Sequence, residues 1–161
     1  MIKYKYPKSL WLIAEEIANA RTETNKNNRK NNPRFDRGEK NNDVDILGVV
    51  CELIVLDYLT EKNVDFKMLK ILNPFPTKEA DFTIRNKKID VKANRQSKYL
   101  SVLVNEEAHK KGLGKIDLYW FVYIIDNENC NFYFSDYDDV SKWDCKLMKY
   151  TNAFYRKIKE I

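Results

Sequence analysis

This sequence is short of several residue types, and each shortage excludes a class of protein. Its three cysteines, Cys51, Cys130 and Cys145, are too few and too scattered for a disulfide framework or a zinc knuckle. Its four glycines and four prolines exclude collagen and long low-complexity linkers. It has no uninterrupted run of about 18 apolar residues, so we expect no membrane-spanning helix and no membrane partner.

Histidine is scarcer still, because His109 is the single one in the chain. One histidine excludes a zinc site built on two or more, and it makes Ser-His-Asp or Cys-His catalysis a poor expectation. His109 falls in a polar stretch, so we expect a solvated helix residue. Any chemistry is therefore expected from carboxylates and lysines.

What the chain does contain fits one globular domain spanning residues 1–161. Its 161 residues can bury a core without disulfides or metals. Hydrophobic residues make up 43% and charged residues 33%, a balance that excludes outright disorder. Residues 1–7 lack the apolar stretch of a signal peptide, so we expect a cytoplasmic protein.

Positive charge is concentrated in one segment, residues 24–42. The chain has a formal net charge of +5, and this segment alone carries six Lys or Arg against two Asp or Glu. Seven of its residues are Asn and none is aliphatic, so it cannot pack a core and is expected to be a loop or arm. Two interpretations stay open, a solvated linker and a loop that contacts phosphates.

Hydrophobic spacing predicts helices at both sides of that segment. The first covers residues 8–22, and the second begins at Asp43 or Asp45 and ends near residue 61. The second helix is apolar around nearly its whole circumference, which is typical of a central, buried helix. Glu52 lies in its middle, where a carboxylate is costly unless it is paired, protonated or bound to a cation.

Alternation predicts a strand-rich second half. Strands are expected at 64–72, 81–85, 88–93, 99–104, 117–125 and 131–135, a turn at 73–76, and helices at 105–111, 136–148 and 151–161. The order of elements indicates an α/β fold.

The strands at 81–85 and 88–93 are expected to form a hairpin with a two-residue turn at Asn86-Lys87. The cross-strand pairs are then Arg85 with Lys88, Thr83 with Asp90, and Asp81 with Lys92. In this register Asp81 and Asp90 are diagonal neighbours on one face, beside Lys92. Two acids next to a lysine suit Mg²⁺, a hard ion that prefers oxygen ligands.

These residues resemble the PD-(D/E)xK nuclease superfamily. Its pattern is a helix acid, an Asp at the end of one strand, and an acid two residues before a Lys on the next strand. Here these are Glu52, Asp81 and the triplet Asp90-Val91-Lys92. The aromatic run at 117–123 is similar to the strand that follows the catalytic hairpin in restriction-enzyme-like members. The resemblance covers residues 43–135, although Ala80 replaces the Pro of the motif.

The resemblance implies a restriction-endonuclease-like fold with a three-layer core, a central mixed β-sheet flanked by helices. It implies a Mg²⁺-dependent DNA nuclease and favours an endonuclease over an exonuclease. Mn²⁺ is expected to substitute for Mg²⁺. Glu52, Asp81, Asp90 and the Val91 carbonyl would hold the metal, and Lys92 would assist the water that attacks the phosphodiester. Double-stranded or branched DNA is the expected partner. Many small members are homodimers because two sites cut two strands.

Basic residues around the hairpin and in the 24–42 segment are the expected phosphate contacts. They are Arg29, Lys30, Arg34, Arg37, Arg85, Lys87, Lys88, Arg95 and Lys98.

Alternatives to this interpretation stay open. Acid-x-Lys triplets also occur at 65–67 and 144–146, although neither has a matching acid on a preceding strand. One alternative is a charged hairpin on an ordinary α/β domain, with Glu52 hydrogen-bonded internally, which leaves the burial of that carboxylate unexplained. A non-catalytic nucleic-acid-binding or partner-binding module on the same fold is the main alternative. A third is an interaction surface built from the aromatics of the C-terminal half, Trp120, Tyr133, Tyr137, Trp143, Tyr150 and Tyr155.

Overall fold

The computed structural model describes residues 1–29, 42–68, 79–95, 101–148 and 151–158. In chain order the elements are β1 (Ile2–Lys5), α1 (Leu10–Arg29), α2 (Asn42–Glu61), β2 (Lys67–Met68), β3 (Phe82–Ile84), β4 (Lys87–Arg95), β5 (Ser101–Asn105), α3 (Glu106–Lys111), β6 (Leu118–Ile124), β7 (Asn129–Asp136), α4 (Tyr137–Val140), β8 (Asp144–Leu147) and β9 (Asn152–Lys157). None of the helices in these ranges is long and apolar enough to cross a membrane.

The strands form two sheets. The larger one has six strands in the order β1-β7-β6-β4-β3-β2, and the smaller one has three in the order β5-β9-β8. Strands β4 and β6 are parallel and the other neighbours are antiparallel, so the larger sheet is mixed. The expectation of an α/β fold with a central mixed sheet is confirmed.

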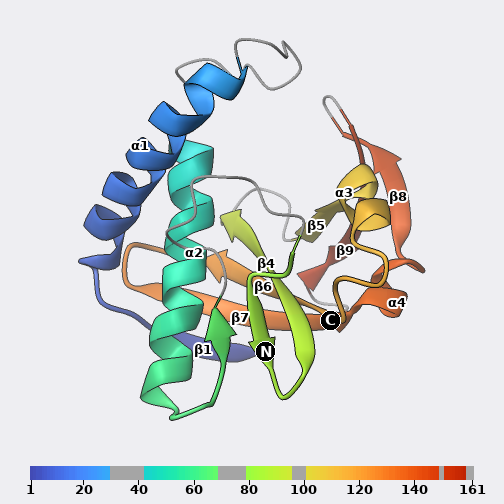
Figure 1. Cartoon of the computed structure of the whole chain (residues 1–161). Helices are drawn as coiled ribbons and strands as arrows, with labels where there is room; N and C mark the ends of the chain where they lie inside the picture. The colour runs from blue at the N-terminus through green and yellow to red at the C-terminus, as the bar shows by residue number, and fades with distance from the viewer. Residues whose placement is uncertain (30–41, 69–78, 96–100, 149–150, 159–161) are drawn as a thin grey trace.

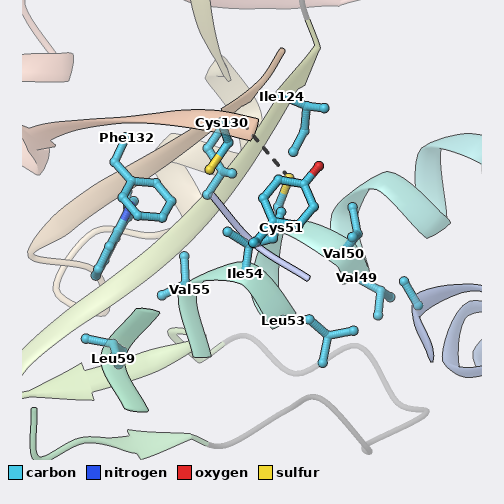
Figure 2. Close-up of a cluster of buried hydrophobic side chains, with 14 of the residues drawn as sticks. Val49, Val50, Cys51, Leu53, Ile54, Val55, Leu59, Ile124, Cys130 and Phe132 are labelled. Carbon is cyan, nitrogen blue, oxygen red and sulfur yellow. Dashed lines mark hydrogen bonds between the residues drawn. The ribbon is translucent and has the colours of Figure 1, made fainter. Parts of the chain in front are cut away.

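Helices α1 and α2 cover one face of the larger sheet (Figure 1). Between them and the sheet lies the helix-side core, shown in part in Figure 2. Its buried members are Tyr6, Ala14, Ala18, Val49, Val50, Cys51, Leu53, Ile54, Val55, Leu59, Phe82, Ile89, Trp120, Val122, Ile124, Cys130 and Phe132. Since α2 supplies seven of these residues, the prediction of a central, buried helix is confirmed.

A second core lies on the other face of the larger sheet, under the smaller sheet and α4. This small-sheet core consists of Val102, Val104, Tyr119, Phe121, Tyr123, Tyr133, Tyr137, Val140 and Trp143. Strand β6 serves both cores, because its even-numbered residues from 120 to 124 face the helices and its odd-numbered residues from 119 to 123 face the smaller sheet. Three layers result, although the outer layer on this side is mainly strand rather than the helices expected from the sequence.

The two cores account for most C-terminal aromatics. Tyr133, Tyr137 and Trp143 are buried in the small-sheet core and Trp120 in the helix-side core, and Tyr155 is half-buried. Tyr150 lies outside the described residues. Core packing therefore explains these side chains better than an exposed interaction surface does.

Several expected elements differ in the structure. The helices expected at 136–148 and 151–161 are wrong. Among the described residues of these ranges, α-helix is limited to the four residues of α4, and β8 and β9 form a hairpin whose strand β9 pairs with β5. Strand β1, which pairs with β7, is not among the strands expected from the sequence. Residues 24–29 belong to α1 instead of a loop, and α2 begins at Asn42, so Asp43 and Asp45 lie in its first turn.

Other expectations fall partly outside the described residues. The rest of the basic segment, 30–41, and the turn at 73–76 are not among them. Of the strand expected at 64–72, the structure has the two residues of β2, and residues 69–72 are not described.

Candidate active site

The β3–β4 hairpin has a different register from the one expected. Phe82 pairs with Ile89 and Ile84 pairs with Lys87, so the two turn residues are Arg85 and Asn86. Their φ angles are 47° and 66°, as a two-residue turn that matches the strand twist requires. The turn expected at Asn86-Lys87 is therefore wrong by one residue, and the cross-strand pairing by two. Every side chain nevertheless stays on its expected face, because a shift of two residues preserves the alternation.

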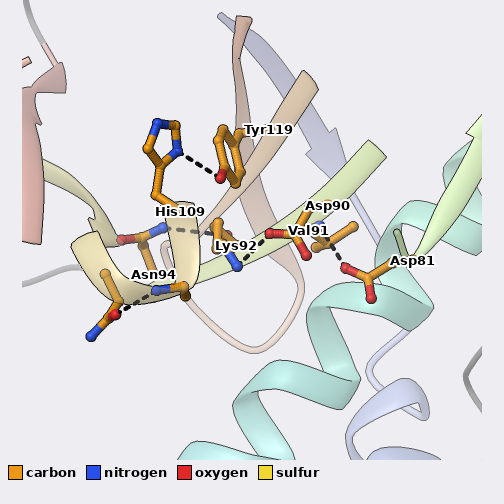
Figure 3. A network of polar contacts seen from close by, with 9 residues as sticks. Asp81, Asp90, Val91, Lys92, Asn94, His109 and Tyr119 are labelled. Atoms are coloured by element: carbon orange, nitrogen blue, oxygen red, sulfur yellow. Dashed lines mark hydrogen bonds and ion pairs between the residues drawn. The ribbon is translucent and has the colours of Figure 1, made fainter. Parts of the chain in front are cut away.

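Asp81 closes the open end of this hairpin. Its main-chain N–H donates to the carbonyl of Ile89 at 2.9 Å, and its Oδ2 accepts from the N–H of Val91 at 2.7 Å. The side chain is 8% exposed. The carboxylate is thus fixed against the main chain between Asp90 and Lys92 (Figure 3). In the observed register Asp81 precedes Phe82 and lies opposite Asp90, closer than the diagonal position expected.

Asp90 and Lys92 form an ion pair on β4 (Figure 3). Their side chains are 14% and 27% exposed, so both are largely withdrawn from water. Asp90 Oδ2 is buried and accepts no hydrogen bond from the described residues, so within them its partner is the Lys92 ammonium of this ion pair. Since Ile89 and Val91 pack on the helix-side core, alternation directs Asp90 and Lys92 to the other face.

Glu52 has a partner that the sequence did not indicate. Its Oε2 pairs with Nη2 of Arg21 on α1 at 3.2 Å, and 16% of the Glu52 side chain is exposed. A charge this far withdrawn from water needs such a partner. Glu52 lies on α2, which belongs to the helix layer.

The structure therefore brings Asp81, Val91, Asp90 and Lys92 together, and it holds Glu52 in an ion pair with Arg21. Within the described ranges, no group of three or more His, Cys, Asp or Glu side chains is placed so that it could hold a metal ion. The donor chemistry of the hairpin, two carboxylates and the Val91 carbonyl, suits a hard divalent cation such as Mg²⁺ or Mn²⁺. The joint metal site with Glu52 stays a prediction.

The predicted phosphate contacts lie at both ends of the hairpin. Arg85, Lys87 and Lys88 are exposed at its turn, and Lys88 Nζ donates to the carbonyl of Gly114 at 3.3 Å. Arg95 is exposed at the end of β4, with its guanidinium 5.3 Å from the ring centre of Trp11. Of the remaining residues, Arg29 ends α1, and Lys30, Arg34, Arg37 and Lys98 lie outside the described residues.

The competing triplets sit in less enclosed places. Asp65 is exposed before the short strand β2, and Lys67 is exposed on it. Asp144 and Lys146 are exposed on β8, where Asp144 Oδ2 accepts from the Tyr155 hydroxyl at 3.1 Å. Of the three triplets, only Asp90-Val91-Lys92 has a half-buried acid and lysine. Within the described residues it is also the only one whose central N–H donates to a second acid, Asp81.

His109 contradicts its expected role as a solvated helix residue. It is 3% exposed, and its ring stacks on Tyr137 with centroids 4.0 Å apart. Nδ1 lies 2.9 Å from the Tyr119 hydroxyl, and Nε2 lies 2.9 Å from Oγ of Ser141. Burial, with a smaller effect of the charge on Lys92, lowers the pKa of His109. One signal in the sequence was the apolar run that contains Tyr119. Its odd-numbered side chains face away from the helices, so other residues must bury them on that side of the sheet.

Comparison with known proteins adds no identity to this geometry, because no family model, no curated protein and no solved structure matches the chain.

Proposed function

We propose that this protein is a metal-dependent nuclease that hydrolyses phosphodiester bonds of DNA. The observation that carries the proposal is the hydrogen bond from Val91 N–H to Asp81, which fixes one acid between the second acid, Asp90, and Lys92. An acid pair beside a lysine, half withdrawn from water, is the arrangement that the resemblance to PD-(D/E)xK nucleases requires. The mixed sheet between two outer layers is compatible with a restriction-endonuclease-like fold.

In this proposal Asp81, Asp90 and the carbonyl of Val91 would hold the metal, together with Glu52 if Arg21 releases it. A divalent cation supplies Lewis-acid polarisation of the scissile phosphate and of the attacking water. Lys92 is directed at the same place by its ion pair with Asp90. Its ammonium would orient that water, or its neutral amine would take up the proton of the water. Exposed Arg85, Lys87 and Lys88 would contact the phosphate backbone of duplex or branched DNA.

A second candidate is a non-catalytic nucleic-acid-binding module on the same fold. One observation favours it, because two of the three acids are already neutralised by side chains of the chain itself, Glu52 by Arg21 and Asp90 by Lys92. Such a module would bind DNA with no need for a divalent cation.

A plasmid cleavage assay tests the proposal, with supercoiled DNA in Mg²⁺, in Mn²⁺ and in EDTA. We expect metal-dependent nicking or linearisation that falls about 100-fold or more in Asp90→Ala and in Lys92→Ala. The matched controls are Asp65→Ala and Lys67→Ala, which alter another acid-x-Lys triplet and should leave the rate within about twofold.

Loss of activity in the control variants instead would assign the site to residues 65–67. Activity that survives Asp90→Ala and Lys92→Ala would sink the assignment. If the wild type cleaves neither plasmid, branched DNA nor RNA but binds DNA in EDTA, the binding module is the better description.

A further inference from the structure

A chain of polar groups runs from the surface to the candidate active site, and the proposed nuclease chemistry uses only its inner end. It begins at the exposed Ser141, whose Oγ lies 2.9 Å from Nε2 of the buried His109. Figure 3 shows the next step, from His109 to the Tyr119 hydroxyl, and Lys92 follows, with its Nζ 5.6 Å from the centre of the Tyr119 ring. At this distance the ammonium is attracted to the ring face.

The direction of the hydrogen bonds in this chain follows from Ser141. Its hydroxyl donates to the carbonyl of Tyr137 at 3.2 Å, so at the histidine it accepts, and His109 Nε2 carries the proton. Nδ1 is then the acceptor for the hydroxyl of Tyr119. The neutral ring that this requires agrees with the lowered pKa of His109. Ser141 is not activated as a nucleophile, because its proton is directed away from the histidine.

Tyr119 is held on all sides by this arrangement. It is 1% exposed, it lies beside Asp90 in the parallel pairing of β4 with β6, and its ring is near parallel to that of Tyr137. Burial and the negative charge of Asp90 both raise the pKa of its hydroxyl, which therefore stays a donor. Without an acceptor at Nδ1 this donor would be buried and unsatisfied, and the ring would have to move.

We infer that His109 is a positioning residue for Lys92. It acts through Tyr119: the histidine fixes the hydroxyl, the hydroxyl fixes the ring, and the ring face holds the Lys92 ammonium beside Asp90. The inference rests on the proposed nuclease function, since Lys92 matters to catalysis only there. It adds a residue from outside the hairpin to the catalytic arrangement.

Two substitutions of His109 separate positioning from simple core packing. In His109→Asn the amide oxygen reaches the place of Nδ1 and accepts from Tyr119, whereas in His109→Gln the amide reaches the place of Nε2 and leaves Tyr119 without an acceptor. We expect His109→Gln to lower kcat by about tenfold or more, because a displaced catalytic group costs this much. DNA affinity measured in Ca²⁺ should stay unchanged. His109→Asn and Ser141→Ala should stay within about threefold of the wild type.

Equal losses of kcat in His109→Gln and His109→Asn would overturn the inference, as would a rise in KM with kcat unchanged. A second readout needs no activity, namely the rate of Lys92 acetylation by acetic anhydride relative to exposed Lys3, followed by mass spectrometry. Faster acetylation in His109→Gln but not in His109→Asn supports positioning, and equal rates in both overturn it. An inert wild type with this difference in acetylation would contradict the proposed nuclease while leaving the link from His109 to Lys92 intact.

Discussion

The two cores on opposite faces of the larger sheet are built on different principles. The helix-side core is largely aliphatic, and α2 fills it with side chains such as Ile54 and Val55 that need only the right volume. The small-sheet core contains Tyr119, Tyr137 and the ring of His109, and each of these brings a polar atom inside. A dry core tolerates exchange of apolar side chains, whereas a polar one demands a particular partner for every donor.

Strand β6 makes the comparison direct, because neighbouring residues of one strand face the two cores. Trp120 packs against Phe132 and Tyr58 on the helix side, while Tyr119 donates to His109 on the other. The face with the polar network is also the face toward which Asp90 and Lys92 project. The face of the sheet that is packed mainly with apolar side chains is therefore separate from the face that carries the candidate catalytic residues.

The largest effect that the comparison predicts is the loss of volume from the helix-side core. Phe132 is fully buried against Tyr4, Tyr58 and Trp120, so Phe132→Ala should lower the free energy of unfolding by about 3–5 kcal/mol. Urea unfolding followed by circular dichroism measures this. Leu12→Ala, at a side chain that is 68% exposed, is the control and should cost less than about 0.5 kcal/mol. A cost below about 1 kcal/mol for Phe132→Ala would contradict this picture of a tightly packed core.

A smaller loss of stability should follow from removing the hydroxyl oxygen of Tyr119 in the small-sheet core. Tyr119→Phe keeps the ring but leaves Nδ1 of His109 buried without a donor, and we expect a cost of about 1–3 kcal/mol. The matched control is the half-buried Tyr155, where Tyr155→Phe removes a solvent-exposed hydrogen bond to Asp144 and should cost less than about 0.5 kcal/mol. Equal costs for the two variants would mean that the small-sheet core is no more demanding than the surface.

The same difference explains how much of the fold the sequence could predict. The apolar pattern identified α2 because its aliphatic side chains fill the helix-side core, and it identified β6 because that strand is buried on both faces. It failed for β8, whose four residues are all exposed, and β9 finds its partner in β5, about fifty residues earlier. Alternation places the hairpin residues on their faces, but it cannot choose between registers two residues apart.

The candidate site divides in a similar way. The neighbourhood of Asp81, Asp90 and Lys92 follows from a local hairpin, so the spacing in the sequence was enough to predict it. The pairing of Glu52 with Arg21 joins two helices through residues that are 31 positions apart, and no local pattern encodes it. His109 is buried by residues 10 and 32 positions further along the chain, which a polar neighbourhood of its own could not indicate.

The smallest predicted effect is a pH dependence confined to the polar face. His109 is faced by Tyr119 and Tyr137 and by the charge of Lys92, and burial followed by that charge lowers its pKa below the ordinary value of 6.5. The folded protein therefore binds this proton less readily than the unfolded chain does. The histidine does not affect the pH dependence well above pH 6.5, and its stability contribution is lost as the pH falls below that value.

His109→Gln isolates this contribution, because it removes the titrating ring and leaves all other titrating groups in place. At about pH 7.5 the variant should melt below the wild type, since Tyr119 lacks its acceptor. Near pH 5.5 the wild type alone carries the penalty of keeping a buried imidazole neutral, so the gap between the two melting temperatures should narrow. Differential scanning calorimetry at the two pH values measures the gap. A constant gap would mean that folding leaves the pKa of His109 unchanged, and a widening gap would mean that folding raises it. In either case the contrast between the two cores would rest on the tyrosine hydroxyls alone.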